Sequence, residues 1–197
     1  KIYLGVLRHD GDNAPGSVVV NPREIRLHPD IQKVQDNFKN NVALIYLEKS
    51  VQYSDFIRAV CLWTFNDDLI FIRSTPIYAA GYGRDDNGQA SNVKKHSAVK
   101  IVETSECNQE YSGFDQLKGI CIRPNGNGAP CIGDETLYVK YNRKWYLRAM
   151  LSRQTTWDQR VLRGFINFGH NTCSYFHPFA YEDIAQFSDW IEKEMRD

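Results

Sequence analysis

The chain has 197 residues, of which 42% are hydrophobic and 13% aromatic, and its 24 basic side chains balance 24 acidic ones. This length favours one domain with a sizeable core, and the zero net charge gives no footprint for nucleic acid or an anionic membrane surface. No apolar run approaches the roughly 18 residues of a membrane span, and the first ten residues have no signal-peptide pattern.

Apolar residues alternate with polar ones from the start of the chain. Ile2, Leu4 and Val6 share one face of a predicted strand. Apolar runs of strand length predict three further strands, at 42–47, 99–103 and 144–151. Turn clusters separate the runs: "DGDNAPG", "GRDDNGQ" and "RPNGNGAP". Many short strands between turn signals indicate an all-β sandwich or barrel.

The end of the chain follows a helical period instead. In the segment 181–197, apolar residues recur at spacings of three and four, at Ile184, Phe187, Ile191 and Met195. This stripe predicts one amphipathic helix that packs on the body of the domain. Glu182 and Asp183 lie where the positive N-terminal end of such a helix favours carboxylates.

The five cysteines form no Cys-x-x-Cys pair, and no histidine lies at a zinc-like spacing from them. The sequence therefore predicts neither a structural metal site nor a cofactor. Their odd number suggests a disulfide bond to another chain in a secreted protein. Reduced thiols in a cytosolic protein are the alternative that the spacing leaves open.

Four stretches, in order and at matching spacing, resemble the trypsin/chymotrypsin-like serine proteases. "NNVALIYL" is similar to the segment that carries the catalytic aspartate, and "GYG" at 81–83 to the start of the second barrel. "CIGDE" at 131–135 resembles the nucleophile loop, and the final segment from "FAYED" onward resembles the closing helix. The details are most similar to secreted insect members, including the gastrulation-defective-like and clip-type groups.

The resemblance implies an all-β fold of two antiparallel six-stranded β-barrels with a C-terminal α-helix. The opening residues resemble the strand after the catalytic histidine, so we expect the first barrel to be incomplete in this chain. Residues 1–70 would hold the rest of the first barrel, 71–180 the second barrel and 181–197 the helix. Because half a barrel leaves open sheet edges, we expect a proteolytic product that stays docked to its own N-terminal fragment.

The resemblance also implies how the cysteines pair. Cys107 would bond Cys121 and Cys131 would bond Cys173, while Cys61 would bond the upstream chain. The stretch "WTFNDD" at 63–68 is interpreted as the connection between the barrels, with Trp63 and Phe65 as candidate anchors for a partner protein.

The positions that match the catalytic machinery carry other residues. Serine hydrolysis needs a hydroxyl nucleophile, an imidazole base and an acid that orients the imidazole. Asn41 occupies the aspartate position and Glu135 the nucleophile position, while Thr136 follows where the family has glycine. An asparagine at the aspartate position lowers turnover about 10⁴-fold in this family. The catalytic histidine would lie upstream of Lys1, and the five histidines of this chain are interpreted as ordinary loop and surface residues.

The specificity pocket and the activation site are also altered or incomplete. Ala129 stands where trypsin-like members carry the aspartate that binds Arg or Lys, and Arg153 replaces a small residue of the cleft-lining strand. Asp134 matches the aspartate that accepts the freed amino terminus after activation, or it is a turn residue that accepts backbone N–H groups.

These residues predict a secreted, catalytically inactive homologue that acts by binding other extracellular proteins. The resemblance implies a cofactor or regulator of protease cascades in clotting, melanisation and immunity, or a salivary modulator of host haemostasis or immunity. The alternative is an active serine-type endopeptidase that is completed by the missing N-terminal chain.

Overall fold

The structure is a computed structural model that describes residues 1–10, 14–34, 37–65, 69–82, 91–111, 114, 119–125, 135–153 and 178–196. Its regular elements are mostly β-strands, with three short α-helices and a 3-10 turn before the last of them. No helix of these described residues is long and apolar enough to cross a membrane.

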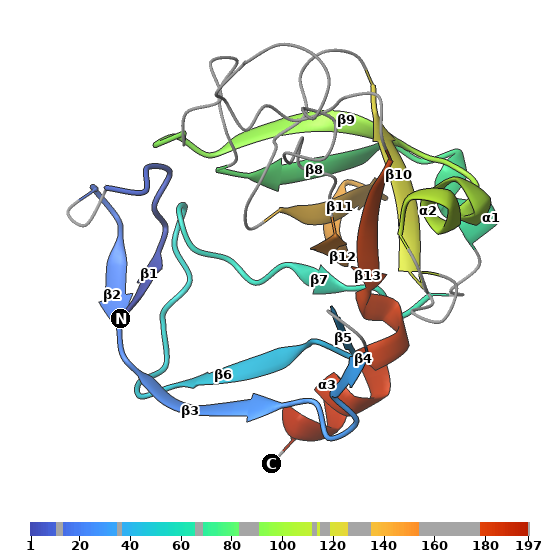
Figure 1. Cartoon of the computed structure of the whole chain (residues 1–197). Helices are drawn as coiled ribbons and strands as arrows, with labels where there is room; N and C mark the ends of the chain where they lie inside the picture. Colours follow the sequence, from blue (N-terminus) through green and yellow to red (C-terminus); the bar gives the residue numbers. More distant parts are fainter. Residues whose placement is uncertain are drawn as a thin grey trace, which may run out of the picture.

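Six antiparallel strands close into a barrel that occupies the upper part of Figure 1. In chain order they are β8 (Ile77–Gly81), β9 (Lys95–Ile101), β10 (Gly119–Pro124), β11 (Thr136–Tyr141), β12 (Lys144–Arg153) and β13 (Phe179–Asp183). The pairing runs β8–β9–β10–β13–β12–β11 and returns from β11 to β8. A short strand, β7 (Cys61–Leu62), adds to β12 in parallel.

The period-two pattern of each strand fills this barrel. On β8, Ile77 and Ala79 are buried, whereas Tyr78 and Ala80 lie on the outer side. β11 follows the same rule, with Leu137 and Val139 inside. These side chains belong to one continuous core that also contains Ile120 and Tyr181. The alternation in the sequence therefore sets which side chains face the interior.

A two-residue turn joins β11 to β12. Asn142 and Arg143 both have positive φ, at 47° and 63°, and Tyr141 pairs with Lys144 across the turn. Two consecutive left-handed residues characterise the tight hairpin turns that match strand twist. Arginine is uncommon at such a left-handed position, because glycine, asparagine and aspartate adopt this backbone conformation at lower cost.

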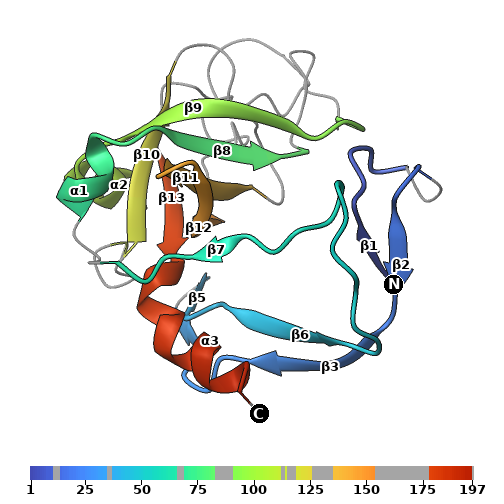
Figure 2. The same ribbon diagram turned by 180° about the vertical axis from the view of Figure 1, so that it is seen from behind.

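The N-terminal residues form smaller sheets beside the barrel (Figure 2). β1 (Ile2–Leu4) pairs with β2 (Val18–Val20), and β3 (Pro22–Leu27) pairs with β6 (Ala43–Leu47). β4 (Gln32–Val34) and β5 (Asn37–Lys39) form a hairpin between them. Among the described strands these sheets have two members each, so the first barrel is not closed within this chain.

Two short helices, α1 (Leu69–Arg73) and α2 (Thr104–Glu110), lie at the side of the barrel (Figure 1). A disulfide between Cys107 and Cys121, with a Cα–Cα distance of 5.8 Å, links α2 to β10. This is the pair that the family resemblance implies. The bond and the buried rings of Tyr111 and Phe114 form a second, smaller core on the outside of the barrel.

The C-terminal helix joins the N-terminal sheets to the barrel. Ile184, Phe187 and Ile191 form a buried cluster with Val42, and Leu62 and Leu147 pack against the same cluster. Residues from the first sheets, from β7 and from β12 therefore meet on one helical stripe, which is the packing role that the sequence predicts for it.

The predicted start of the helix, at residue 181, is wrong. β13 continues through Asp183 because Tyr181 and Asp183 pair with Leu151 and Ala149 of β12. A 3-10 turn, η3 (Ile184–Phe187), follows, and α3 (Ser188–Glu194) comes after it. The Asp183 side chain accepts a hydrogen bond from the Ala185 N–H at 3.0 Å, so it caps the turn.

Candidate functional site

Glu135, which the family resemblance predicts at the nucleophile position, lies immediately before β11 and is buried, with 3% of its surface exposed. Its backbone carbonyl accepts a hydrogen bond from the Leu151 N–H at 2.9 Å. The Tyr181 hydroxyl donates to its side-chain Oε2 at 2.6 Å. Tyr181 belongs to the barrel core. The carboxylate of Glu135 is thus held by a side chain from the interior of the barrel.

The environment of Tyr181 fits this contact. Its side chain is fully buried, and burial raises the pKa of the phenol well above its usual value, with the negative charge of Glu135 and their hydrogen bond adding to the effect. The phenol therefore stays protonated and donates a hydrogen bond to the Glu135 side chain. A hydrogen bond to an ionised acceptor is stronger than one between neutral groups.

Asn41, which the family resemblance predicts at the aspartate position, precedes β6 at the edge of the N-terminal sheets, and its residue surface is exposed. Its backbone N–H donates to Oε2 of Glu182 at 3.2 Å. The preceding Asn40 has a φ of 54°, and its carbonyl accepts from the Val42 N–H at 2.9 Å. Asparagine tolerates this left-handed backbone better than most residues. The segment therefore turns at Asn40 and presents the Asn41 N–H to the barrel.

Glu182 receives that contact on β13, one residue after Tyr181, and only 4% of it is exposed. Burial raises the pKa of this carboxyl, and the backbone N–H groups of Asn41 and Asn40 offset part of the rise. Because successive residues of a strand point to opposite faces, β13 reaches Glu135 with one side chain and Asn41 with the next.

A buried ion pair involves the next residue of β13, Asp183. Arg148 is fully buried, and its Nη2 donates to Asp183 Oδ2 at 2.6 Å. The guanidinium carbon lies 5.2 Å from the ring centroid of Trp63. Trp63 is itself 2% exposed, so its interpretation as a surface anchor for a partner is wrong. The Trp63 ring belongs to the barrel core, and its face lies over the buried Arg148 cation.

The other predicted site residues are placed as follows. Ala129, Cys131, Asp134 and Cys173 lie outside the described residues, and the side chain of Arg153 is not described. Cys61 is partly buried on β7 and has no disulfide partner among the described cysteines. Within the described part of the candidate site, the structure therefore presents Glu135 and Asn41, and each contacts β13.

The three described histidines lie apart from Glu135. His28 packs edge-to-face on Phe187 and Trp190, with ring centroids 5.0 and 4.8 Å apart. His9 contacts Tyr82 in the same geometry at 5.5 Å. His96 lies on the outer face of the barrel beside Tyr78, at 6.0 Å. None of these contacts includes a candidate nucleophile.

Sequence reasoning missed the polar residues of β13 and Arg148. Glu182 and Asp183 were interpreted as helix-end carboxylates, although both are buried in the sheet. The sequence does not indicate that Arg148 of β12 is buried in an ion pair, because its partner, Asp183, lies 35 residues away. The register of β12 against β13 is what brings the pair together.

The fold and these positions define a trypsin-like domain. The trypsin family model ("Trypsin") matches residues 3–135, and the chain belongs to this family. Melanization protease 1 of Drosophila melanogaster is 28% identical over 89% of this chain and 43% of its own length. Serine protease ea of the same fly is 27% identical over 93% and 46%. Phenoloxidase-activating factor 1 of Holotrichia diomphalia is 27% identical over 86% and 43%. The chain thus spans less than half the length of these curated relatives.

Proposed function

We propose that this trypsin-family chain is a secreted, non-catalytic homologue that acts by protein binding as a cofactor or regulator of extracellular protease cascades. The observation that carries the proposal is the position of Glu135. Glu135, the residue that we assign to the nucleophile position from the family resemblance, is buried and accepts a hydrogen bond from Tyr181 of the barrel core.

The chemistry of this arrangement favours inactivity. A carboxylate has no proton that a histidine could remove to generate the alkoxide of serine hydrolysis. Its hydrogen bond to Tyr181 directs the charge to the barrel interior. At the aspartate position, the amide of Asn41 cannot stabilise an imidazolium by charge. Two separate requirements of the mechanism are therefore unmet.

The proposed setting is extracellular. The disulfide between Cys107 and Cys121 is of the kind that persists in oxidising compartments. Relatives are named for melanization and for phenoloxidase activation, which supports a role beside proteases of an insect immune cascade. Modulation of host haemostasis or immunity from saliva is the second setting that we propose.

The exposed face of the β3–β6 sheet favours a further polypeptide segment as a partner of this chain. Ile25, Leu27 and Ile45 lie on one face of the β3–β6 sheet, with more than half of each surface exposed. The opposite face is covered, because Arg26 and Tyr46 contact Glu194 of α3. An exposed apolar sheet face of this kind marks an interaction surface. We propose that the upstream fragment covers it and is bonded to Cys61.

A serine-directed phosphonate probe and a peptide library, applied to the purified two-chain protein, test the absence of catalysis. We expect no labelling and no cleavage, with an active trypsin-like protease as the positive control. Glu135→Ser should restore a hydroxyl without restoring hydrolysis, because Asn41 remains, and Glu135→Ala is its matched control. Specific labelling or cleavage by the wild-type protein would establish the alternative, an active endopeptidase.

A further inference from the structure

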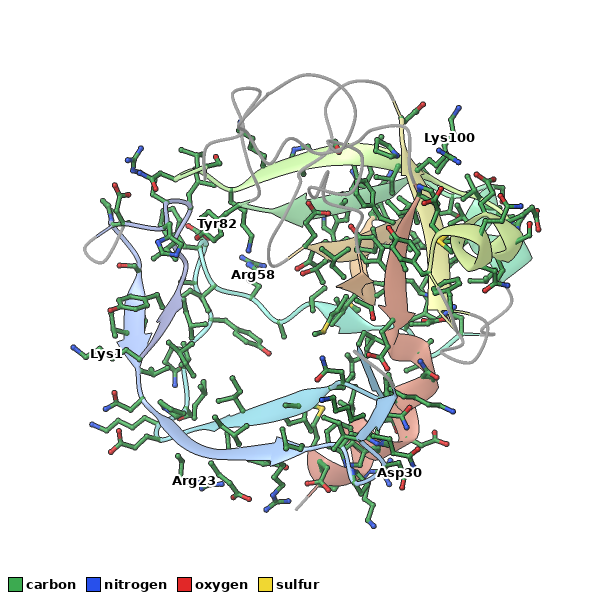
Figure 3. All side chains as sticks on the ribbon, in the orientation of Figure 1. Lys1, Arg23, Asp30, Arg58, Tyr82 and Lys100 are labelled. Atoms are coloured by element: carbon green, nitrogen blue, oxygen red, sulfur yellow. A yellow bond between two sulfur atoms is a disulfide. The ribbon has the colours of Figure 1, made fainter. Side chains whose placement is uncertain are left out.

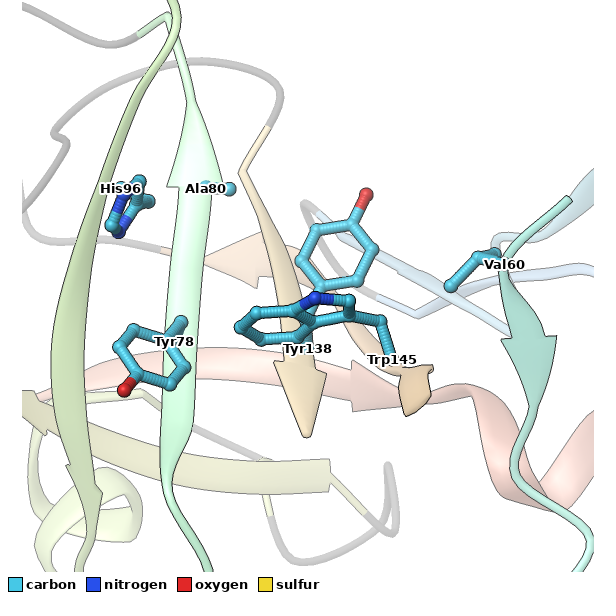
Figure 4. A pocket seen from close by; sticks show the side chains of 6 residues that line it. All are labelled: Val60, Tyr78, Ala80, His96, Tyr138 and Trp145. Carbon is cyan, nitrogen blue, oxygen red and sulfur yellow. The ribbon is translucent and has the colours of Figure 1, made fainter. Parts of the chain in front are cut away.

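An apolar pocket of about 300 Å³ lies on the outer face of the closed barrel. Figure 4 shows its six lining side chains, which come from β8, β9, β11, β12 and the residue before β7: Val60, Tyr78, Ala80, His96, Tyr138 and Trp145. Three of the six are large aromatic residues, so the pocket can bury a partner side chain at low entropic cost to itself.

Strand register creates the hollow. Tyr78 of β8 pairs with Tyr138 of β11, and Ala80 pairs with His96 of β9. The outward side chains therefore stand in rows, and the methyl group of Ala80 is the small member between larger neighbours. In Figure 4 the rings of Tyr138 and Trp145 lie together on one side of this gap, and Val60 lies beyond them.

The aromatic walls support one another. The rings of Tyr78 and Trp145 meet edge-to-face with centroids 5.4 Å apart. Trp145 nevertheless keeps 44% of its surface exposed. An exposed tryptophan that is held in place by a neighbouring ring pays little ordering entropy when it binds, which is the property of aromatic hot spots at interfaces.

The charged residues on the strands that line the pocket are all cationic. Strands β8, β9, β11 and β12 contain no aspartate or glutamate between their first and last residues. Lys140 lies beside the pocket, with its ammonium 5.4 Å from the centroid of the Trp145 ring. The carboxylate of Glu135, which precedes β11, faces Tyr181 instead.

The connection before β7 adds another cation. Figure 3 shows Arg58 on this connection, two residues before the pocket-lining Val60. Its guanidinium is 3.6 Å from Asp55 in an exposed ion pair, and both side chains are largely open to solvent. Such a pair is weak, so an acidic partner can compete for the guanidinium.

We propose that this pocket docks an acidic segment of a partner protein through an aromatic side chain. The apolar lining accepts the ring, and Lys140 beside Trp145 and Arg58 on the connection to Val60 attract carboxylates that flank it. The lining offers few polar groups to orient a polar metabolite, which favours a peptide anchor. The inference deepens the proposed binding function and rests on it, and it adds a partner surface outside the candidate catalytic positions.

Fluorescence anisotropy with labelled pentapeptides and the purified full-length protein tests the proposal. The probe is acetyl-Asp-Glu-Phe-Glu-Asp-amide, and its matched controls replace the central Phe by Ala or the four acids by Lys. We expect the acidic Phe peptide to bind, and each control to bind at least about tenfold more weakly.

Three variants locate the binding. Trp145→Ala should weaken the acidic Phe peptide about tenfold or more, as expected for loss of an aromatic hot spot. Lys140→Glu keeps the pocket rings and should weaken it about threefold or more through charge reversal. Lys1→Glu, at an exposed site far from these strands in Figure 3, should leave affinity within about twofold. Circular dichroism spectra that match the wild type establish that the variants are folded.

Each other result overturns the docking proposal. Absence of binding at millimolar peptide, equal binding of the basic peptide, or unchanged binding by Trp145→Ala would each do so. Binding that occurs only after reduction at Cys61 would overturn the proposal as well, because the pocket would then hold a tethered segment of this protein and not a separate partner. Mass spectrometry of the recovered peptides distinguishes failure of the docking proposal from failure of the proposed function. Cleaved peptide would contradict the absence of catalysis, whether or not the pocket binds the peptide.

Discussion

At the scale of single residues, three consecutive side chains of β13 organise the candidate site. Tyr181 donates to Glu135, Glu182 accepts from the backbone of Asn41, and Asp183 pairs with Arg148. All three residues of β13 are buried. The two residues predicted at the nucleophile and aspartate positions, Glu135 and Asn41, therefore both contact β13.

The raised pKa of Glu182 predicts a pH-dependent effect of Glu182→Gln. Because the folded pKa lies above the unfolded one, the folded state binds the proton more tightly, and the stability that this group contributes is lost as pH rises through the folded pKa. We expect the variant to gain stability relative to wild type between pH 4 and neutral pH, and to match it at lower pH. Guanidinium unfolding at several pH values measures this trend.

Glu24→Gln provides the control with the opposite sign. The Arg26 guanidinium beside Glu24 lowers the pKa of that carboxyl, so its contribution is present above the unfolded pKa and is lost as pH falls. The Glu24 variant should therefore lose stability relative to wild type toward neutral pH, by a small amount because the pair is exposed. A pH-independent difference for Glu182→Gln would contradict the assigned cause.

At the scale of elements, the period-two pattern identifies strands well but leaves their ends open. The predicted strands at 42–47 and 144–151 correspond to β6 (Ala43–Leu47) and β12 (Lys144–Arg153). The predicted helix starts too early, because a stripe at 184, 187 and 191 is compatible with a strand that ends at 183. Pairing with β12, which is a non-local contact, decides that boundary.

The β11–β12 turn predicts a stabilising substitution, Arg143→Gly. A left-handed residue with a Cβ costs roughly 1–2 kcal/mol, whereas the extra freedom of glycine in the unfolded chain costs roughly 0.5–1 kcal/mol. We expect a net gain of up to about 1.5 kcal/mol in the free energy of unfolding. Thermal and guanidinium unfolding measure the gain.

Asn142→Gly is the matched control in the same turn. Asn142 has a φ of 47°, but asparagine adopts this conformation at lower cost than arginine. Its replacement should therefore stabilise the protein less than Arg143→Gly does. Destabilisation by Arg143→Gly would show that the arginine side chain contributes a contact that outweighs its backbone strain.

At the scale of the whole molecule, a closed barrel and a set of open sheets share one C-terminal helix. The barrel has a ring of paired strands and a filled interior, whereas the β3–β6 sheet buries one face against α3 and exposes Ile25, Leu27 and Ile45 on the other. The barrel therefore buries its apolar core within this chain, whereas the β3–β6 sheet leaves part of its apolar surface exposed.

This difference predicts that Cys61 is bonded to a polypeptide segment outside the 197 residues. Nonreducing mass analysis of the protein from its natural source should find Cys61 in a disulfide-linked peptide. The same linked segment should lower the binding of a hydrophobic dye, because it covers the exposed face of the β3–β6 sheet. A free thiol at Cys61 would remove the main support for the two-chain proposal, and reduced dye binding after reduction would contradict it as well.

The sequence by itself determined the family, the alternation of the strands and the helical stripe, and it predicts which residues stand at the catalytic positions. These properties are local, because periodicity and motif spacing are carried by neighbouring residues. Only the tertiary structure decided that Glu135 meets Tyr181, that Glu182 meets Asn41 and that Trp63 covers Arg148. These contacts join distant parts of the chain, and strand register and barrel closure, which no local pattern encodes, bring them together.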